Sequence, residues 1–171
     1  VALITRGGYG LSRSLPALPL KAISRSIERG MLWVGLSDFT AFQAAVYAQT
    51  QGVTWAGPAL CADFGCGDLA EGHDSPPDDI MEACFGDLVQ GVCEGAGWSM
   101  PKASLPIATD LIASGADSER ASGQKGVKNT SFSGVLWGGN LYRLTSLIGT
   151  PYFPSISKGI VWFEDVAEHP Y

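Results

Sequence analysis

The sequence predicts an α/β fold: a parallel-sheet N-terminal domain, followed by a linker and the start of a second, β-rich domain. Two observations support this prediction. Short apolar runs alternate with segments of helical periodicity over the first third of the chain, a pattern typical of parallel sheets with crossover helices. A long segment rich in Gly, Ala, Ser, Asp and Lys then shows little periodicity, and apolar runs return towards the C-terminus.

Five elements are expected in the N-terminal domain. In order, they are a strand over residues 1–5, a helix over residues 12–29, a strand over residues 31–36, a helix over residues 38–51 and a strand over residues 53–56. The second helix has Phe39, Phe42 and Val46 on one face, and Gly52 ends it. Because ligands of parallel sheets bind at the carboxyl ends of the strands, the residues after the first two strands are expected to face one pocket.

The remainder of the chain has fewer clear elements. We expect a helix over residues 78–88, ordered structure again from residue 134, a helix through Leu144, Leu147 and Ile148, and a final strand over residues 159–163. This organisation predicts an N-terminal domain over residues 1–94, a loop or linker over residues 95–133 and the start of a C-terminal domain over residues 134–171.

Composition limits the classes of function. The chain has 171 residues, of which 46% are hydrophobic and 16% charged, as is typical of a globular domain with a core. Its net charge of −6 argues against a nucleic-acid partner, and no apolar run is long enough to span a membrane. The four cysteines lack the paired spacing of a zinc site, so no metal is expected. Scattered cysteines are usual in reducing compartments, and we expect a cytoplasmic protein.

Ser37 carries the clearest chemical signal. It follows an apolar run that ends at Gly35, and it precedes a segment with helical periodicity. A serine on such a strand-to-helix turn presents its hydroxyl above the sheet, and a small residue such as Gly35 lets the turn close, which is the design of a nucleophile elbow. The helix N-terminus adds partial positive charge where an oxyanion would form. The alternative is an ordinary N-cap, in which Ser37 or Asp38 accepts a hydrogen bond from the first turn.

Other candidate residues also have two interpretations. The segment Arg6-Gly7-Gly8-Tyr9-Gly10 is either a plain turn or a phosphate-binding loop. Glu164, at the end of the last expected strand, is either a functional carboxylate or a charge that faces solvent. Asn140 is either a site residue or a cap or turn residue, and Tyr9 and Trp137 either line a pocket or belong to the core.

Five segments occur in a defined order along the chain. They are Arg6-Gly7-Gly8-Tyr9-Gly10, Gly35-Leu36-Ser37-Asp38, Trp137-Gly138-Gly139-Asn140-Leu141, Leu147-Ile148-Gly149-Thr150-Pro151 and Phe163-Glu164-Asp165-Val166. In this order they resemble the L,D-carboxypeptidases, a serine peptidase family that includes the muramoyltetrapeptide carboxypeptidases and the microcin-immunity peptidases. The resemblance runs from about residue 2 to the end of the chain and is weakest between residues 62 and 133.

The resemblance implies roles for individual residues. Ser37 matches the family's nucleophile, and Glu164 matches the acid of its catalytic triad, which holds the histidine in the correct tautomer. The backbone N–H groups of Asp38 and Gly8 match the two donors of the oxyanion hole. The segment that ends at Asn140 is expected to be a loop near the active site, and Arg6 is available to bind a substrate carboxylate. The substrate-binding candidates are Arg6, Gly7, Tyr9 and Asn140.

The catalytic histidine is the main departure from the family pattern. The family places it far beyond the Glu164-Asp165 pair, in a part of the second domain that this chain lacks, and neither His73 nor His169 matches its position. Val1 lies inside one apolar run and Tyr171 shortly after another, so we expect the chain to be an internal piece of a longer protein. Because a serine without a base is a weak nucleophile, the chain alone is expected to have little or no activity.

The resemblance implies a serine carboxypeptidase that removes the terminal D-Ala from the murein tetrapeptide during cell-wall recycling. The implied partners are the murein peptide and, for the full-length protein, a second copy in a homodimer; no metal or organic cofactor is implied. The alternatives are a microcin-immunity peptidase acting on a peptidyl-nucleotide toxin, an esterase of the α/β-hydrolase type and an inactive fragment. The esterase is disfavoured because Phe39 stands where that fold has a glycine.

Overall fold

The fold is taken from a computed structural model, which describes residues 1–65, 76–92 and 133–166. Of these residues, 1–65, 76–92 and 135–166 belong to one compact unit. The expected linker falls almost entirely outside the described residues, and so do His73 and His169. The domain boundaries therefore stay predictions.

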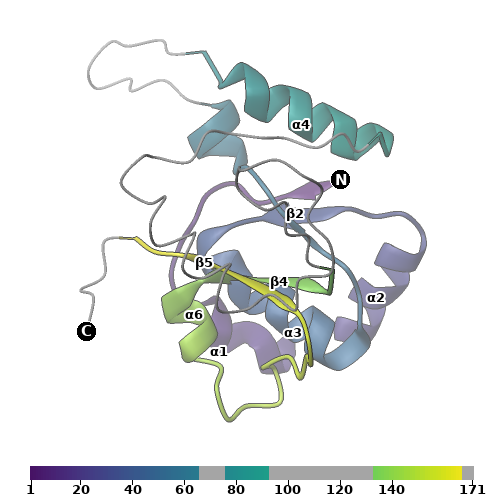
Figure 1. The fold of residues 1–171 in the computed structure, drawn as a ribbon, viewed down its shortest axis with the longest axis vertical. Helices are drawn as coiled ribbons and strands as arrows, with labels where there is room; N and C mark the ends of the chain where they lie inside the picture. The colour runs from purple at the N-terminus through teal and green to yellow at the C-terminus, as the bar shows by residue number, and fades with distance from the viewer. Residues whose placement is uncertain (66–75, 93–132, 167–171) are drawn as a thin grey trace, which may run out of the picture. The chain divides into compact units, whose positions relative to one another are not determined.

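The first three strands form a parallel sheet in the order β1-β2-β3, as the alternating pattern predicted. Ala2 pairs with Trp33 and Val34 pairs with Trp55, so the apolar runs lie side by side (Figure 1). The strands are shorter than expected, and they are β1 (Ala2–Leu3), β2 (Trp33–Gly35) and β3 (Trp55–Ala56).

The prediction of a single helix over residues 12–29 is wrong, because the structure has three shorter helices there. Pro16 lies in the first turn of the second of these helices and Pro19 precedes the third, and proline has no backbone N–H to continue a helical ladder. The three helices are α1 (Leu11–Ser14), the 3₁₀ helix η1 (Leu15–Ala17) and α2 (Leu20–Glu28).

The helix expected over residues 38–51 is present as a 3₁₀ turn, η2 (Ser37–Phe39), followed by α3 (Thr40–Thr50). Helix α3 is the centre of the unit, and α1, α2 and α6 (Leu141–Thr145) all contact it (Figure 1). Its buried apolar side chains belong to two clusters. One contains Leu15, Ala41, Ala44, Ala45, Leu144 and Leu147, and the other contains Ile23, Phe42 and Val46. The small alanines allow the C-terminal segment to approach α3 closely.

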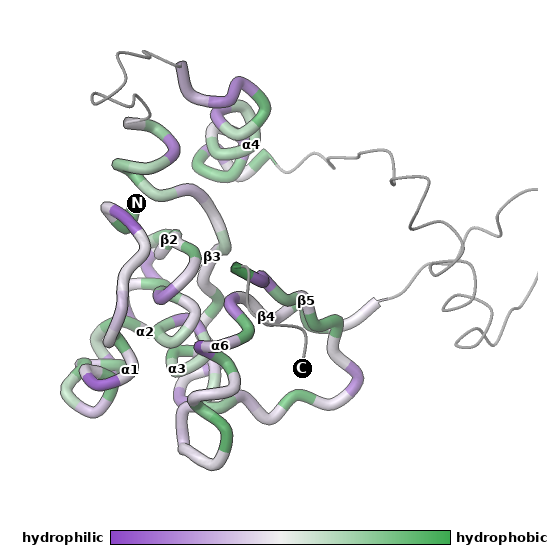
Figure 2. The backbone as a smooth tube through the Cα atoms, turned by 90° about the vertical axis from the view of Figure 1, so that its left-hand side faces the viewer, coloured by the Kyte–Doolittle hydropathy of each residue, from purple (hydrophilic) through white to green (hydrophobic). Residues whose placement is uncertain are grey.

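A second parallel pair consists of β4 (Leu136–Asn140) and β5 (Ile160–Glu164), which Figure 2 shows with hydrophobic stretches. The segment ending at Asn140 was expected as a loop, and this expectation is wrong because it lies within β4. Gly138 and Gly139 have φ angles of 142° and 129°, which side chains rarely allow. A Cβ at Gly138 would lie 1.9 Å from the carbonyl oxygen of Trp162, so glycine is required for this pairing.

Two further helical segments lie outside this core. Asp78 caps α4 (Asp79–Gln90) by accepting a hydrogen bond from the Met81 N–H at 2.7 Å, which matches the helix expected over residues 78–88. A π-helical turn, η3 (Leu60–Phe64), follows the first sheet, and the Phe64 ring meets the Phe85 ring of α4 edge to face at 5.1 Å. In the described part of the chain, we find no helix whose length and hydropathy would let it cross a membrane.

Candidate active site

Ser37 lies on a strained turn between β2 and α3. Its φ angle is +60°, in the left-handed region that costs a residue with a Cβ about 1–2 kcal/mol. The turn closes because residue 35 is glycine: a Cβ there would lie 2.6 Å from Phe39 and 2.8 Å from Ile4. This geometry confirms the expected need for a small residue at position 35. Residues other than glycine are uncommon in this conformation and occur often at functional sites, and in the described part of the chain Gln51 and Lys158 have similar φ angles of 58°.

The hydroxyl of Ser37 faces the glycine turn that follows β1. A Cβ at Gly7 would lie 3.1 Å from Ser37 Oγ, so a larger residue at position 7 would crowd the hydroxyl. The neighbouring Gly8 has open space around its Cβ position. Within the described residues, the N–H of Gly8 has no acceptor, and Asp38 lies in the first turn of η2, where an N–H has no intrahelical acceptor. Both N–H groups are therefore available to a ligand.

The side chain of Asp38 does not cap a helix, and neither does that of Ser37, so the N-cap interpretation is wrong. The Asp38 carboxylate is buried, and its Oδ2 accepts a hydrogen bond from the Leu11 N–H at 3.0 Å. Its Oδ1 makes no directed hydrogen bond but forms an ion pair with Arg143, whose Nε lies 2.9 Å away. Asp38 thus joins the serine turn to α1 and to α6.

Thr40 and Asn140 provide a second connection between the two halves of the site. The backbone N–H of Asn140 donates to Thr40 Oγ1 at 3.0 Å, and both residues are buried. A Cβ at Gly139 would lie 2.4 Å from the same Thr40 oxygen, so glycine permits this approach. The Asn140 side chain caps α6 by accepting from the Arg143 N–H at 3.1 Å, which confirms the interpretation as a cap.

Glu164 is brought to the same end of the site by the pairing of β4 and β5. It is the register partner of Asn140, whose N–H binds Thr40 three residues after Ser37. The residue is half-buried, and its Oε2 atom is buried without a hydrogen-bond donor among the described residues. Burial contradicts the interpretation as a solvent-facing charge. A buried carboxylate oxygen without a donor is costly, so this atom is suited to a further partner.

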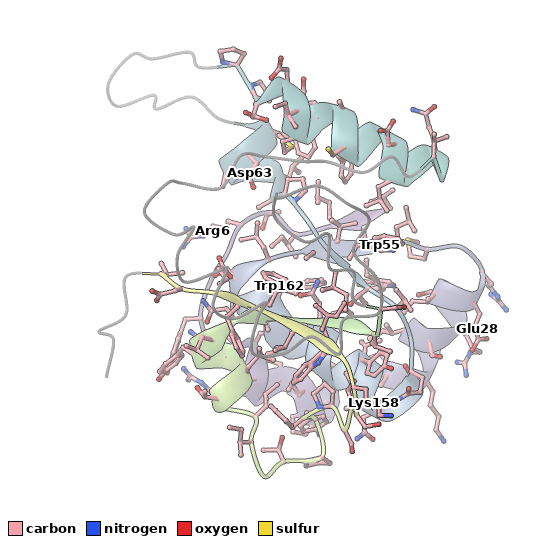
Figure 3. The ribbon with its side chains drawn as sticks, viewed as in Figure 1. Arg6, Glu28, Trp55, Asp63, Lys158 and Trp162 are labelled. Atoms are coloured by element: carbon pink, nitrogen blue, oxygen red, sulfur yellow. The ribbon has the colours of Figure 1, made fainter. Side chains whose placement is uncertain are left out.

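The glycine turn, residues 6–10, has two side chains that were expected to bind substrate, and both lie at the surface. Arg6, which Figure 3 labels, is exposed. Its Nε donates to the Gly7 carbonyl oxygen at 3.1 Å. Tyr9 is 71% exposed and therefore not part of the core. The Tyr9 ring is contacted by the guanidinium groups of Arg13 and Arg143, whose Cζ atoms lie 4.9 Å and 4.8 Å from the ring centre.

Sequence reasoning missed three residues of this region: Arg13, Thr40 and Arg143. Thr40 and Arg143 act through partners about a hundred residues away in sequence, and such pairings leave no local pattern. Asp38 was the one signal in the sequence that a cationic partner exists, because a buried carboxylate requires a hydrogen-bond donor or a cation. Arg13 lies four residues after Tyr9, but the sequence does not place its side chain on the ring.

Trp137 belongs to a different feature. A cavity of about 330 Å³ lies between α3, β3 and the β4–β5 pair, and its walls include Trp55, Trp137 and Trp162. Figure 3 labels Trp55 and Trp162. Trp137 also meets the Phe153 ring edge to face at 5.9 Å and packs against the core. The cavity lining does not include Ser37 or Glu164, so this space is separate from the candidate active site.

No group of three or more potential metal ligands is found among the described residues. In that part of the chain, Cys61 and Cys84 are free and exposed.

Family comparison agrees with this geometry. The LD-carboxypeptidase N-terminal domain model matches residues 1–57, and the LD-carboxypeptidase C-terminal domain model matches residues 133–171. The first match contains Ser37 and the glycine turn, and the second contains Asn140 and Glu164. The chain belongs to the LD-carboxypeptidase family.

Individual relatives fall into two groups. The muramoyltetrapeptide carboxypeptidase from Oxalobacter formigenes superposes with a TM-score of 0.68 at 30% identity, over 99% of this chain and 46% of that protein. The microcin C7 self-immunity protein MccF, in complex with aspartyl sulfamoyl adenosine, superposes with a TM-score of 0.62 at 25% identity, over 97% of this chain and 48% of that protein. These likenesses support the mixed helix and parallel-sheet fold.

A curated relative extends the comparison. A Bacillus subtilis (strain 168) protein named "Probable murein peptide carboxypeptidase" is 27% identical over 165 residues, which cover 96% of this chain and 42% of that protein. The chain therefore spans less than half the length of the curated relatives that it matches.

Proposed function

We propose that this chain carries the nucleophile of a serine carboxypeptidase that removes the terminal D-Ala from the murein tetrapeptide. The bond cleaved joins an L centre to the D-amino acid. The strained conformation of Ser37, with its hydroxyl against Gly7, is the observation that carries the proposal. The names of the Oxalobacter and Bacillus relatives support the choice of a murein peptide as substrate.

In the proposed reaction, Ser37 Oγ attacks the carbonyl carbon of the terminal peptide bond. The N–H groups of Asp38 and Gly8 stabilise the oxyanion, because both are free of protein acceptors in the described part of the chain. The glycine turn lets the substrate backbone approach these donors, since Gly8 has no neighbour within 4 Å of its Cβ position. Loss of the D-residue leaves an acyl-enzyme, which water then hydrolyses.

Glu164 is proposed to orient the general base. A carboxylate in this role accepts the imidazole N–H of a histidine and stabilises the imidazolium that forms during the reaction. The buried Glu164 Oε2 has the free acceptor capacity that this role needs. The resemblance assigns the histidine to a part of the protein outside this sequence, and the proposed mechanism requires no metal or organic cofactor.

A microcin-immunity activity on a peptidyl nucleotide is the second candidate. It rests on the similarity to MccF, whose solved complex holds aspartyl sulfamoyl adenosine. We favour the murein substrate because identity and TM-score are both higher for the muramoyltetrapeptide carboxypeptidase. A cytoplasmic location, a role in cell-wall recycling and a homodimeric full-length protein complete the proposal.

The test is release of D-Ala from a muramyl tetrapeptide by this chain, by a longer form that includes the histidine, and by that form with Ser37→Ala. We expect activity in the longer form, none in Ser37→Ala and little in the chain alone. Activity that survives Ser37→Ala would overturn the assignment of the nucleophile. Cleavage of a peptidyl sulfamoyl adenosine, without D-Ala release, would favour the second candidate. Inactivity of the longer form on both substrates would overturn the proposed function.

A further inference from the structure

Two arginines share one exposed aromatic ring beside the candidate active site. The Cζ atoms of Arg13 and Arg143 lie 4.9 Å and 4.8 Å from the centre of the Tyr9 ring. The charge of Arg143 is compensated by Asp38 at 2.9 Å. Within the described residues, Arg13 has neither an ion pair nor a side-chain hydrogen bond. One uncompensated guanidinium therefore remains on this ring, in a chain whose net charge is −6.

Arg13 is exposed, and its guanidinium lies against the Gly10 turn. Besides its contact with Tyr9, its Nη2 atom lies 3.4 Å from the position that a Cβ of Gly10 would occupy. Gly10 has a φ angle of +100°, so this turn requires glycine, and the absent side chain leaves room for the guanidinium. An arginine that already packs against a ring and a turn loses less conformational entropy when it binds an anion.

The ring that carries these cations is connected to Ser37 from two sides. Tyr9 follows Gly7 by two residues, and Gly7 lies against Ser37 Oγ. Arg143, on the same ring, pairs with the carboxylate of Asp38, the residue after Ser37. A substrate bound at the serine would therefore extend along a surface where Arg13 offers a free charge.

We propose that Arg13, supported by Tyr9, binds a carboxylate group of the peptide substrate. This proposal rests on the proposed function, because every carboxypeptidase substrate has a terminal carboxylate. A guanidinium has five N–H donors in a planar fork that matches the two oxygens of a carboxylate. Arg13 suits this role better than Arg6, since the Nε of Arg6 is already hydrogen-bonded to Gly7. The carboxylate belongs either to the terminal residue or to a side chain of the substrate.

The test compares three tetrapeptides on the active longer form of the protein. One has all its carboxylates free, the second has the terminal carboxylate amidated, and the third has the side-chain carboxylates amidated. We expect Arg13→Gln to lower kcat/KM for the free peptide by about 10- to 100-fold, as expected for a lost charged hydrogen bond. For the amidated peptide that lacks the recognised carboxylate, the same variant should leave kcat/KM unchanged. The peptide that responds in this way identifies which carboxylate Arg13 binds.

Arg25→Gln is the matched control, since it removes an exposed arginine of α2 that lies outside the site. Binding of the free and amidated peptides in the Ser37→Ala background, measured by calorimetry, separates this proposal from the proposed function because it needs no turnover. We expect Arg13→Gln to remove the preference for the free peptide, and Arg13→Lys to restore part of it. A preference that survives Arg13→Gln, or that Arg6→Gln removes instead, would overturn the proposal.

Discussion

The ion pair between Arg143 and Asp38 offers the sharpest test of how the site is held together. Their side chains are 12% and 9% exposed, so the pair lies largely outside solvent screening. Substitution of Arg143 by methionine keeps much of the volume and the contact with Tyr9, but it leaves the Asp38 carboxylate with Leu11 N–H as its remaining donor. Breaking a buried pair from one side typically costs about 3–5 kcal/mol, because an uncompensated charge stays buried.

The loss of stability is expected to depend on which partner of the ion pair is removed. Arg143→Met should lower the free energy of unfolding by about 3–5 kcal/mol, or Tm by roughly 10 °C for a chain of this size. Asp38→Asn should cost less, about 1–3 kcal/mol, because Arg143 keeps its contacts with the rings of Tyr9 and Tyr142. The double variant should be more stable than Arg143→Met alone, since it leaves no buried charge without a partner.

Urea denaturation of the four proteins measures these free energies and closes a double-mutant cycle. We expect a coupling energy above about 1 kcal/mol, with unchanged m-values. If the two single effects add to within about 0.5 kcal/mol, the pair is not coupled and our reasoning about Asp38 fails. Arg143→Lys serves as the charge-conserving control, and we expect it to recover part of the loss.

Three further substitutions test the site in other ways. Ser37→Gly should be more stable than Ser37→Ala by about 1 kcal/mol, because glycine relieves the strain at φ +60°; equal Tm values would show that the turn is unstrained. Gly7→Ala should lower kcat about tenfold or more, since its Cβ would lie 3.1 Å from Ser37 Oγ. The same substitution should change the free energy of unfolding by less than about 1 kcal/mol. An unchanged rate of D-Ala release would contradict this contact. Thr40→Val should destabilise the protein by about 1–3 kcal/mol, because the buried N–H of Asn140 loses its acceptor. Thr40→Ser keeps the hydroxyl and should not destabilise the protein in this way. Equal losses of stability in both variants would indicate a packing effect instead.

The N-terminal half of the fold could be predicted because its information is local. Alternating apolar runs and helical periodicity placed β1, β2 and β3 in a parallel sheet, and Gly35 before Ser37 indicated the tight turn. The strand β4 could not be recognised in the same way. Gly138 and Gly139 lower its intrinsic preference for a strand, and the conformation is fixed by the close approach of Trp162 and Thr40.

The candidate site was predictable in its segments but not in its connections. Ser37, Gly7, Asn140 and Glu164 were found from motifs, and the structure brings their segments together through Thr40 and through the register of β4 and β5. The catalytic and binding roles themselves stay predictions. The bond from Asp38 to Leu11 spans 27 residues, and a hydrogen-bonding side chain could equally well have capped its own helix. Only the tertiary structure decides between a local and a distant partner.

The hydrogen bond between Asn140 and Thr40 joins residues that are 100 positions apart. Closing a chain loop costs entropy that grows only with the logarithm of its length, so a loop of this size costs about 4 kcal/mol and doubling it adds only about 0.6 kcal/mol. The two halves of the candidate site therefore tolerate large changes in the length of the chain between them. Insertions or deletions in that interval should leave the contacts between the serine segment and the C-terminal half unchanged.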